Sequence, residues 1–285
     1  MKLTEDAMKI DAEQTVTRIK RFIKDYVEKT KTKGICVAVS GGIDSCTTAA
    51  LSALAIGGKR VTALYMPEEE TYSPIEAKHA KQVADKFKFK LETIDITPIF
   101  QAFCKVLPIY DEHDKLSRGN LKARTRMICL YYYANRLGKI VCGSSDKSET
   151  MMGYFTKWGD VSADISPLMD LYKTQVRLVA AHIGIPKEII SKPSTPQLWP
   201  GQLAEQELGI KYETLDLILL GLENFMSVEE IAEQLQLETE FVKRIKNKWL
   251  ASEHKRRPPL TLKQEFRTIG TDFRLPYTPS LTKQD

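Results

Sequence analysis

The sequence lacks the features of membrane proteins and of disulfide-built proteins. It has five cysteines in 285 residues, an odd number, and no C-x-x-C pair. A zinc site or a disulfide framework is therefore not expected, whereas reduced thiols in a core are. No run of about 18 apolar residues could span a bilayer, and the polar N-terminus MKLTEDAMKIDAEQ does not resemble a signal peptide. We expect a soluble, cytoplasmic globular protein.

The net charge is small and unevenly distributed. Forty-two Lys and Arg against 37 Asp and Glu leave +5. Residues 241–267 carry nine basic and two acidic side chains, whereas residues 223–240 carry six Glu and no Lys or Arg. A local basic patch indicates a phosphate-bearing partner, which could be nucleic acid, a membrane surface or a nucleotide.

Apolar periodicity predicts strands that alternate with helices. Ser73-Pro74-Ile75-Glu76 has the pattern of a helix start with a capping box. The alternation is typical of a doubly wound, mostly parallel α/β sheet that binds ligands at the carboxyl ends of its strands. Strands are expected over residues 35–39, 61–66, 90–94 and 139–142. Helices are expected within the first 30 residues, over 44–56, from Ser73 onward and over 120–137.

Two segments with little periodicity are predicted to be loops that cover a site. They are residues 153–170, rich in Gly, Asp and aromatics, and residues 191–202, with three Pro and one Gly. Beyond Tyr212 the pattern becomes helical again. We expect a single domain over 1–285, with a core at about 15–190, a helical C-terminal extension at about 210–262 and a tail at 263–285.

The strongest local signal is Val39-Ser40-Gly41-Gly42-Ile43-Asp44-Ser45, directly after the first strand. Paired glycines allow positive φ, and the N–H groups of such a turn and of the following helix point at one anion site. Asp44 beside that site favours Mg²⁺-phosphate over bare phosphate. The alternative is that Asp44 only caps the helix. Walker A and dinucleotide-binding glycine patterns are absent.

The Ser-Gly-Gly-x-Asp-Ser loop resembles the pyrophosphate loop of N-type ATP pyrophosphatases. Together with four later segments it is similar to ammonia-dependent NAD synthetases, over about residues 15–262. These segments are GNLKARTRM at 119–127, GSSDKSE at 143–149, GYFTKWGD with ADISPL at 153–168, and SEHKRRPP at 252–259. The sequence departs from many relatives at Ile43, Ser144-Ser145-Asp146 and Thr195-Pro196-Gln197-Leu198-Trp199.

The resemblance implies a Rossmann-like fold of the adenine nucleotide alpha hydrolase type. It also implies a carbon–nitrogen ligase that amidates deamido-NAD with ammonia and ATP, through an acyl adenylate, to give NAD, AMP and pyrophosphate. This is the final step of NAD biosynthesis. Mg²⁺ as cofactor and a homodimer follow from the same resemblance. The similarity uses nearly the whole chain and leaves no room for a glutaminase domain, so free ammonia is the expected donor.

The resemblance also places roles on matching positions. ATP would be bound by Ala38, Val39, Ser40, Gly41, Gly42, Ile43, Asp44, Ser45, Ser144, Lys173 and Thr195. Mg²⁺ would be held by Asp44 and Glu149, which both follow strand ends that meet at one edge of the sheet. Deamido-NAD would be bound by Arg124, Lys157, Asp164, His254 and Lys255. The expected catalytic residues are Asp44, Lys157, Lys173 and Asp160, and either Asp160 or Asp164 could deprotonate ammonium.

Each assignment has a simpler alternative when the residue is taken alone. Glu149 could be a first-turn acid favoured by the helix dipole, and Arg124 or Lys173 could be solvated helix charges. A different class of function is nucleic-acid binding, because residues 227–235 and 240–246 imitate a helix-turn-helix with a basic second helix. We interpret this pair as a packed helical hairpin and expect no nucleic-acid partner. Thiolating relatives and GMP synthetase fit poorly, since reactive cysteine pairs and extra domains are missing.

Overall fold

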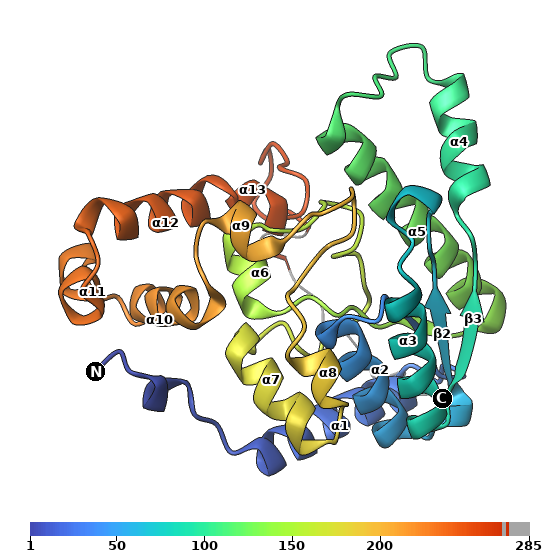
Figure 1. The fold of residues 1–285 in the computed structure, drawn as a ribbon, viewed down its shortest axis with the longest axis horizontal. Helices are drawn as coiled ribbons and strands as arrows, with labels where there is room; N and C mark the ends of the chain where they lie inside the picture. Colours follow the sequence, from blue (N-terminus) through green and yellow to red (C-terminus); the bar gives the residue numbers. More distant parts are fainter. Residues whose placement is uncertain (270–271, 274–285) are drawn as a thin grey trace.

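A computed structural model describes residues 1–269 and 272–273 (Figure 1). The expected four-stranded parallel sheet is confirmed, with the order β3-β2-β1-β4. Ile35 pairs with Val61 on one side and with Ile140 on the other, so the strand order changes direction between β1 and β4. The strands are β1 (Ile35–Ala38), β2 (Val61–Tyr65), β3 (Lys90–Thr93) and β4 (Ile140–Val141).

Helices cover both faces of the sheet, which makes it doubly wound. Ile35 and Val37 of β1 face a core shared with one set of helices, whereas Cys36 faces a core shared with α5. This alternation explains why the first strand is a continuous apolar run. The first set is α1 (Ala12–Lys29), α2 (Ile43–Ile56), α3 (Pro74–Phe87) and α7 (Lys173–His182), and α5 spans Lys115–Leu137.

A second core lies beyond the sheet, at the opposite end of the molecule from β3 (Figure 1). It combines Met151 and Met152 with buried side chains of the C-terminal helices. Val242 and Ile245 are buried in this core, so the basic helix of the helix-turn-helix pattern packs as half of a hairpin. The helices are α9 (Ala204–Leu208), α10 (Tyr212–Glu223), α11 (Val228–Leu235), α12 (Thr239–Ala251) and α13 (Glu253–Arg256).

Several elements differ from expectation. Helix α5 begins at Lys115 rather than near 120, because the Asp114 side chain accepts the backbone N–H of Ser117 at 3.0 Å and caps the helix. The capping box at Ser73 is wrong: Ser73 makes no side-chain cap bond, and the Glu76 carboxylate accepts a hydrogen bond from Lys192 at 2.6 Å instead. Helix α4 (Thr97–Val106) was not predicted.

Short helices complete the described part of the chain. They are η1 (Glu5–Met8), η2 (Gly58–Arg60), η3 (Glu69–Thr71), α6 (Lys147–Met152) and α8 (Lys187–Ile190). None of the described helices is long and apolar enough to cross a membrane. Residues 270–271 and 274–285 of the predicted tail lie outside the described residues, and the proposed division of the chain stays a prediction.

Candidate active site

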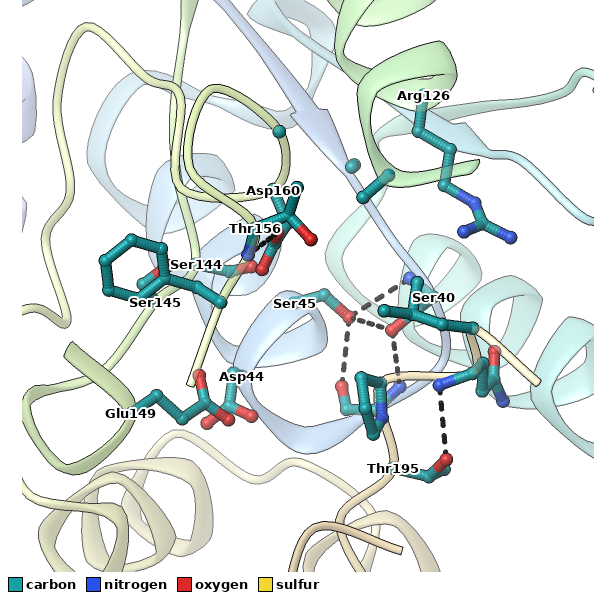
Figure 2. Close-up of a pocket in the computed structure, with 18 of the residues that line it drawn as sticks. Ser40, Asp44, Ser45, Arg126, Ser144, Ser145, Glu149, Thr156, Asp160 and Thr195 are labelled. Atoms are coloured by element: carbon teal, nitrogen blue, oxygen red, sulfur yellow. Dashed lines mark hydrogen bonds between the residues drawn. The ribbon is translucent and has the colours of Figure 1, made fainter. Parts of the chain in front are cut away.

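The turn between β1 and α2 is held by hydrogen bonds of its own serine hydroxyl groups. Ser45 Oγ accepts the backbone N–H of Ser40 and donates to the carbonyl of Gly42, both at 3.1 Å. Gly42 is the N-cap of α2 and Asp44 lies in its first turn. Figure 2 shows the two serines linked in this way. The turn therefore presents backbone N–H groups and a helix N-terminus to one point, as an anion site requires.

A cavity of about 520 Å³ opens above this turn, at the carboxyl ends of β1 and β2. Its walls come from α5, from both predicted cover segments and from α13. Fifteen of the predicted site residues line it, namely Ala38, Val39, Ser40, Gly42, Ile43, Asp44, Ser45, Arg124, Ser144, Glu149, Lys157, Asp160, Thr195, His254 and Lys255.

Three predicted residues do not line the cavity. Gly41 forms the back of the turn, and Lys173 lies fully buried beneath Asp44. The Asp164 carboxylate accepts the backbone N–H of Val141 at 2.7 Å. In this chain it therefore caps the end of β4, and its contact with the substrate stays a prediction.

Below the cavity, one ammonium group is surrounded by three carboxylates. Lys173 Nζ lies 2.7 Å from Asp44, 2.7 Å from Asp146 and 2.9 Å from Glu149, measured to the nearest carboxylate oxygen. We call these four residues the acidic centre. Burial alone would lower the Lys173 pKa, but the three carboxylates raise it well above its ordinary value. Lys173 therefore stays protonated, and the centre holds more carboxyl groups than cations; burial raises the pKa of Glu149 well above its ordinary value, although Lys173 opposes the shift.

The acidic centre fits a divalent cation. Oxygens of Asp44, Asp146 and Glu149 lie within 4.8 Å of one another, and the buried Asp44 Oδ1 has no hydrogen-bond partner. Asp44 and Glu149 lie next to each other at the cavity floor (Figure 2). Carboxylate oxygens are the protein ligands that Mg²⁺ prefers. Both predicted metal ligands thus converge, as the positions of the strand ends implied.

Asp146 was missed by the sequence reasoning. Its Oδ1 accepts the backbone N–H of Glu149 at 2.8 Å and caps α6, while its Oδ2 faces Lys173. Burial raises its pKa to about 6, although Lys173 acts in the opposite direction. The D-x-x-E spacing of Asp146 and Glu149 at a helix start is the signal that could have found it.

The opposite wall carries cations that rest on backbone carbonyls. Lys157 Nζ donates to the carbonyl of His254 at 2.6 Å, and Arg124 donates to the carbonyl of Lys157 at 3.1 Å. Lys255 donates to two carbonyls of the segment from Gly153 to Phe155. We call Arg124, Lys157, His254 and Lys255 the basic rim. No carboxylate in the described part of the chain forms a salt bridge with any of them, so the rim can receive an anion.

Asp160 is the predicted acid nearest to this rim. Its Oδ1 accepts the backbone N–H of Thr156 at 2.8 Å, and Figure 2 shows the side chain directed into the cavity. The residue is exposed at the cavity wall. Burial of its carboxyl group by the protein around it raises the pKa of Asp160, and the Lys255 charge opposes the shift. Asp160 is therefore a carboxyl group with increased basicity.

The two cover segments are joined by hydrogen bonds to Glu207 of α9. The Tyr154 hydroxyl donates to Glu207, and Gln202 Nε2 donates to the same carboxylate at 3.1 Å. Gln202 Oε1 in turn accepts the backbone N–H of Leu198 at 2.9 Å. Sequence reasoning identified both covers but not this link, because no local pattern connects Tyr154 with Glu207.

The model of the NAD synthase family matches residues 15–259. The chain belongs to this family. It is 44% identical over 261 residues to an NH(3)-dependent NAD(+) synthetase of Hyperthermus butylicus, covering 91% of this chain and 94% of that protein. It is 45% identical over 251 residues to one of Methanocaldococcus jannaschii, covering 87% and 96%.

A solved structure with a similar fold is named for a different product. The NMN synthetase of Francisella tularensis superposes with a TM-score of 0.78 at 30% identity, covering 89% of this chain and 99% of that one. Family membership and the fold are thus shown together, and the resemblance inferred from the five motifs is confirmed.

Proposed function

We propose that this protein is an ammonia-dependent NAD synthetase that amidates deamido-NAD with ATP to give NAD, AMP and pyrophosphate. The observation that carries the proposal is the presence of three elements around one cavity. They are the turn between β1 and α2 at residues 39–45, which we call the phosphate turn, the acidic centre and the basic rim. The turn suits ATP, and the rim suits a substrate that bears a carboxylate and phosphates. The family relatives named for this activity support the same reaction.

The first step is attack of the pyridine carboxylate on the α-phosphorus of ATP, with pyrophosphate as leaving group. The N–H groups of the turn and the N-terminus of α2 stabilise the charge that builds on the leaving phosphates. Mg²⁺ held by Asp44 and Glu149 would neutralise phosphate charge when bound. Lys157 of the basic rim orients the carboxylate near the α-phosphate. Lys173 keeps the acidic centre in place from below.

In the second step ammonia attacks the acyl carbon of the adenylate, and AMP leaves. Ammonium must first lose a proton, and we assign Asp160 as the acceptor of that proton. Water would hydrolyse the adenylate, so the cover segments must exclude water from the cavity. The bonds of Tyr154 and Gln202 to Glu207 hold both covers over the cavity.

The test is product analysis. Purified protein is incubated with deamido-NAD, ATP and Mg²⁺, and with either ammonium or glutamine. We expect equimolar NAD, AMP and pyrophosphate with ammonium and far less NAD with glutamine. Equal kcat/KM for the two nitrogen donors would contradict the ammonia assignment. Absence of AMP with every donor would overturn the proposed reaction.

A second candidate is the corresponding reaction on a mononucleotide. It is favoured by the similarity to the NMN synthetase of Francisella tularensis. The same assay with nicotinate mononucleotide in place of deamido-NAD separates the two. We expect the dinucleotide to have the higher kcat/KM, and the reverse order would replace the first proposal with the second.

We also propose that the protein acts as a homodimer in the cytoplasm. Ile128 and Tyr132, one turn apart on α5, are exposed at 54% and 67%, as a covered face in an oligomer would explain. All five cysteines are free thiols, which suits a reducing compartment. Analytical ultracentrifugation tests the dimer, and a sedimentation coefficient of a monomer at micromolar concentration would contradict it.

A further inference from the structure

A lysine of the second cover segment reaches the phosphate turn. Lys192 Nζ donates to Glu76 Oε1 at 2.6 Å and to the backbone carbonyl of Gly41 at 3.2 Å. The Glu76 side chain is 5% exposed and the Lys192 side chain 19%. This buried pair therefore joins three parts of the site, namely helix α3, the phosphate turn and segment 191–202.

The position of Gly41 is fixed by α3. Its φ is +84°, and a Cβ at this residue would lie 2.4 Å from the backbone oxygen of Glu76. Only glycine fits such a conformation and such a close approach. The turn thus rests directly on α3, while the side chain of Glu76 holds Lys192 beside the Gly41 carbonyl.

Holding this carbonyl also sets the direction of the next N–H group. In a planar trans peptide, the Gly41 carbonyl and the Gly42 N–H point in opposite directions. Gly42 lines the cavity and Gly41 does not. Among the described residues, the hydrogen bond of the Gly42 N–H is a long one of 3.3 Å to Ser40 Oγ, so it can still donate to a ligand. A flipped peptide would instead turn a carbonyl oxygen toward the phosphates and repel them.

We propose that Lys192 is a positioning residue for ATP, which holds the Gly41–Gly42 peptide with its N–H toward the phosphates and couples this orientation to the docking of segment 191–202. The inference rests on the proposed use of the turn for ATP. Lys192 acts through the peptide and stays on Glu76 when ATP binds. If Lys192 instead left Glu76 and bound the phosphates, Glu76→Gln would be expected to strengthen ATP binding.

The experiment measures the affinity for ATP with Mg²⁺ by calorimetry, without pyridine substrate. We expect Lys192→Gln to weaken ATP binding about tenfold, and Lys192→Arg to restore part of it. Glu76→Gln should weaken ATP binding about threefold, because a neutral partner holds the ammonium less firmly. Tighter ATP binding by Glu76→Gln, or unchanged binding by Lys192→Gln, would overturn the proposal.

A double variant that replaces both charges with neutral side chains is the control for misfolding. Lys192→Gln alone leaves a buried carboxylate without its cation, whereas Lys192→Gln combined with Glu76→Gln removes both charges. We expect the double variant to unfold close to the wild-type temperature and to bind ATP no more weakly than Lys192→Gln, since the two residues act as one unit. Fully additive losses would contradict the shared role.

Lys86, on the same helix α3 as Glu76, offers a control for Lys192. It also donates to the carbonyl of a glycine with positive φ, Gly184 at +82°, but it is exposed and does not line the cavity. Lys86→Gln should leave ATP affinity unchanged, and an equal loss there would refute a specific role for Lys192. Because the readout needs no turnover, failure of the amidation assay and failure of this proposal are distinguishable.

Discussion

The acidic centre and the basic rim hold their charges in opposite ways. In the centre, a fully buried lysine lies within hydrogen-bond distance of three carboxylates. Within the described residues, the Lys157 and Arg124 side chains of the rim donate to backbone carbonyls. Carbonyl oxygens orient a cation without cancelling its charge. One side of the cavity therefore pairs its carboxyl groups with a buried lysine, and the other carries cations that form no salt bridge with a described carboxylate.

This difference assigns each side a different ligand charge. A buried cluster with more carboxylates than cations can accept a metal ion without rearranging the fold, since its ligands are already held together by Lys173. The rim can accept a carboxylate or phosphate without first breaking an ion pair. Binding an anion at paired cations would require separation of existing partners, which costs several kcal/mol in buried settings.

The largest effect is expected when the cation of the centre is removed. Lys173→Met leaves three carboxyl groups without their cation, and loss of one member of a buried ion pair costs about 3–5 kcal/mol of unfolding free energy. Loss of a positioned electrostatic group lowers kcat by roughly a factor of 10³. Mg²⁺ should then raise the melting temperature of this variant more than that of the wild type. Differential scanning fluorimetry with and without Mg²⁺ measures this.

Lys122 supplies the control for this prediction. It is 1% exposed and lies 2.6 Å from both Glu68 and Glu70, but it does not line the cavity. Lys122→Met should be destabilised to a similar extent without the additional rescue by Mg²⁺. Equal rescue of both variants, or none in Lys173→Met, would show that the acidic centre is not a cation site.

Asp160 is the acid near the basic rim that we propose as the base for ammonium. A positioned general base contributes about 10²-fold, so Asp160→Asn should lower turnover with ammonia by that factor. Burial of the carboxyl group raises the pKa of Asp160 above its usual 3.8. The ratio of wild-type to variant activity should therefore fall as the pH drops through the raised pKa, because the protonated acid cannot accept a proton. A pH-independent ratio would rule out this role.

The same shift has a consequence for stability. The native state binds the Asp160 proton more tightly than the unfolded chain does, so stability declines as pH rises from about 3.8 through the raised pKa. Asp160→Asn removes this decline. Denaturant unfolding at pH 4 and pH 7 should show the variant gaining stability relative to wild type at the higher pH.

Replacing one cation of the rim should affect only one substrate. Lys157→Met is expected to raise the KM for deamido-NAD about tenfold, as loss of one charged hydrogen bond would, and to leave ATP affinity unchanged. Arg60 is the control, because it also donates to two backbone carbonyls, of Thr32 and Lys33, but lies away from the cavity. Arg60→Gln should change neither constant. Weaker ATP binding by Lys157→Met would contradict the assignment of the basic rim to deamido-NAD alone.

The elements with strong local signals could be predicted from the sequence. The apolar run at 35–39 and the glycine pair gave β1 and the phosphate turn, and the meeting of strand ends placed Asp44 with Glu149. The partners of these residues could not be predicted. Asp146 and Lys173 lie close together because α6 and α7 pack against each other. Glu76 fits a local capping pattern in the sequence, but in the folded chain it pairs with Lys192 instead. Charged residues choose partners by tertiary proximity, which local spacing does not encode.

The smallest effect is expected from the link between the covers. Tyr154→Phe removes one hydrogen bond to Glu207, worth about 1 kcal/mol, and should let water reach the adenylate more often. We expect the ratio of AMP to amide product to rise a few-fold, with little change in ATP affinity. Tyr133 is a matched tyrosine whose hydroxyl donates to Glu92 at 2.9 Å, outside the cavity lining. If Tyr133→Phe raised the ratio equally, or Tyr154→Phe did not raise it, the covers would not protect the intermediate through this link.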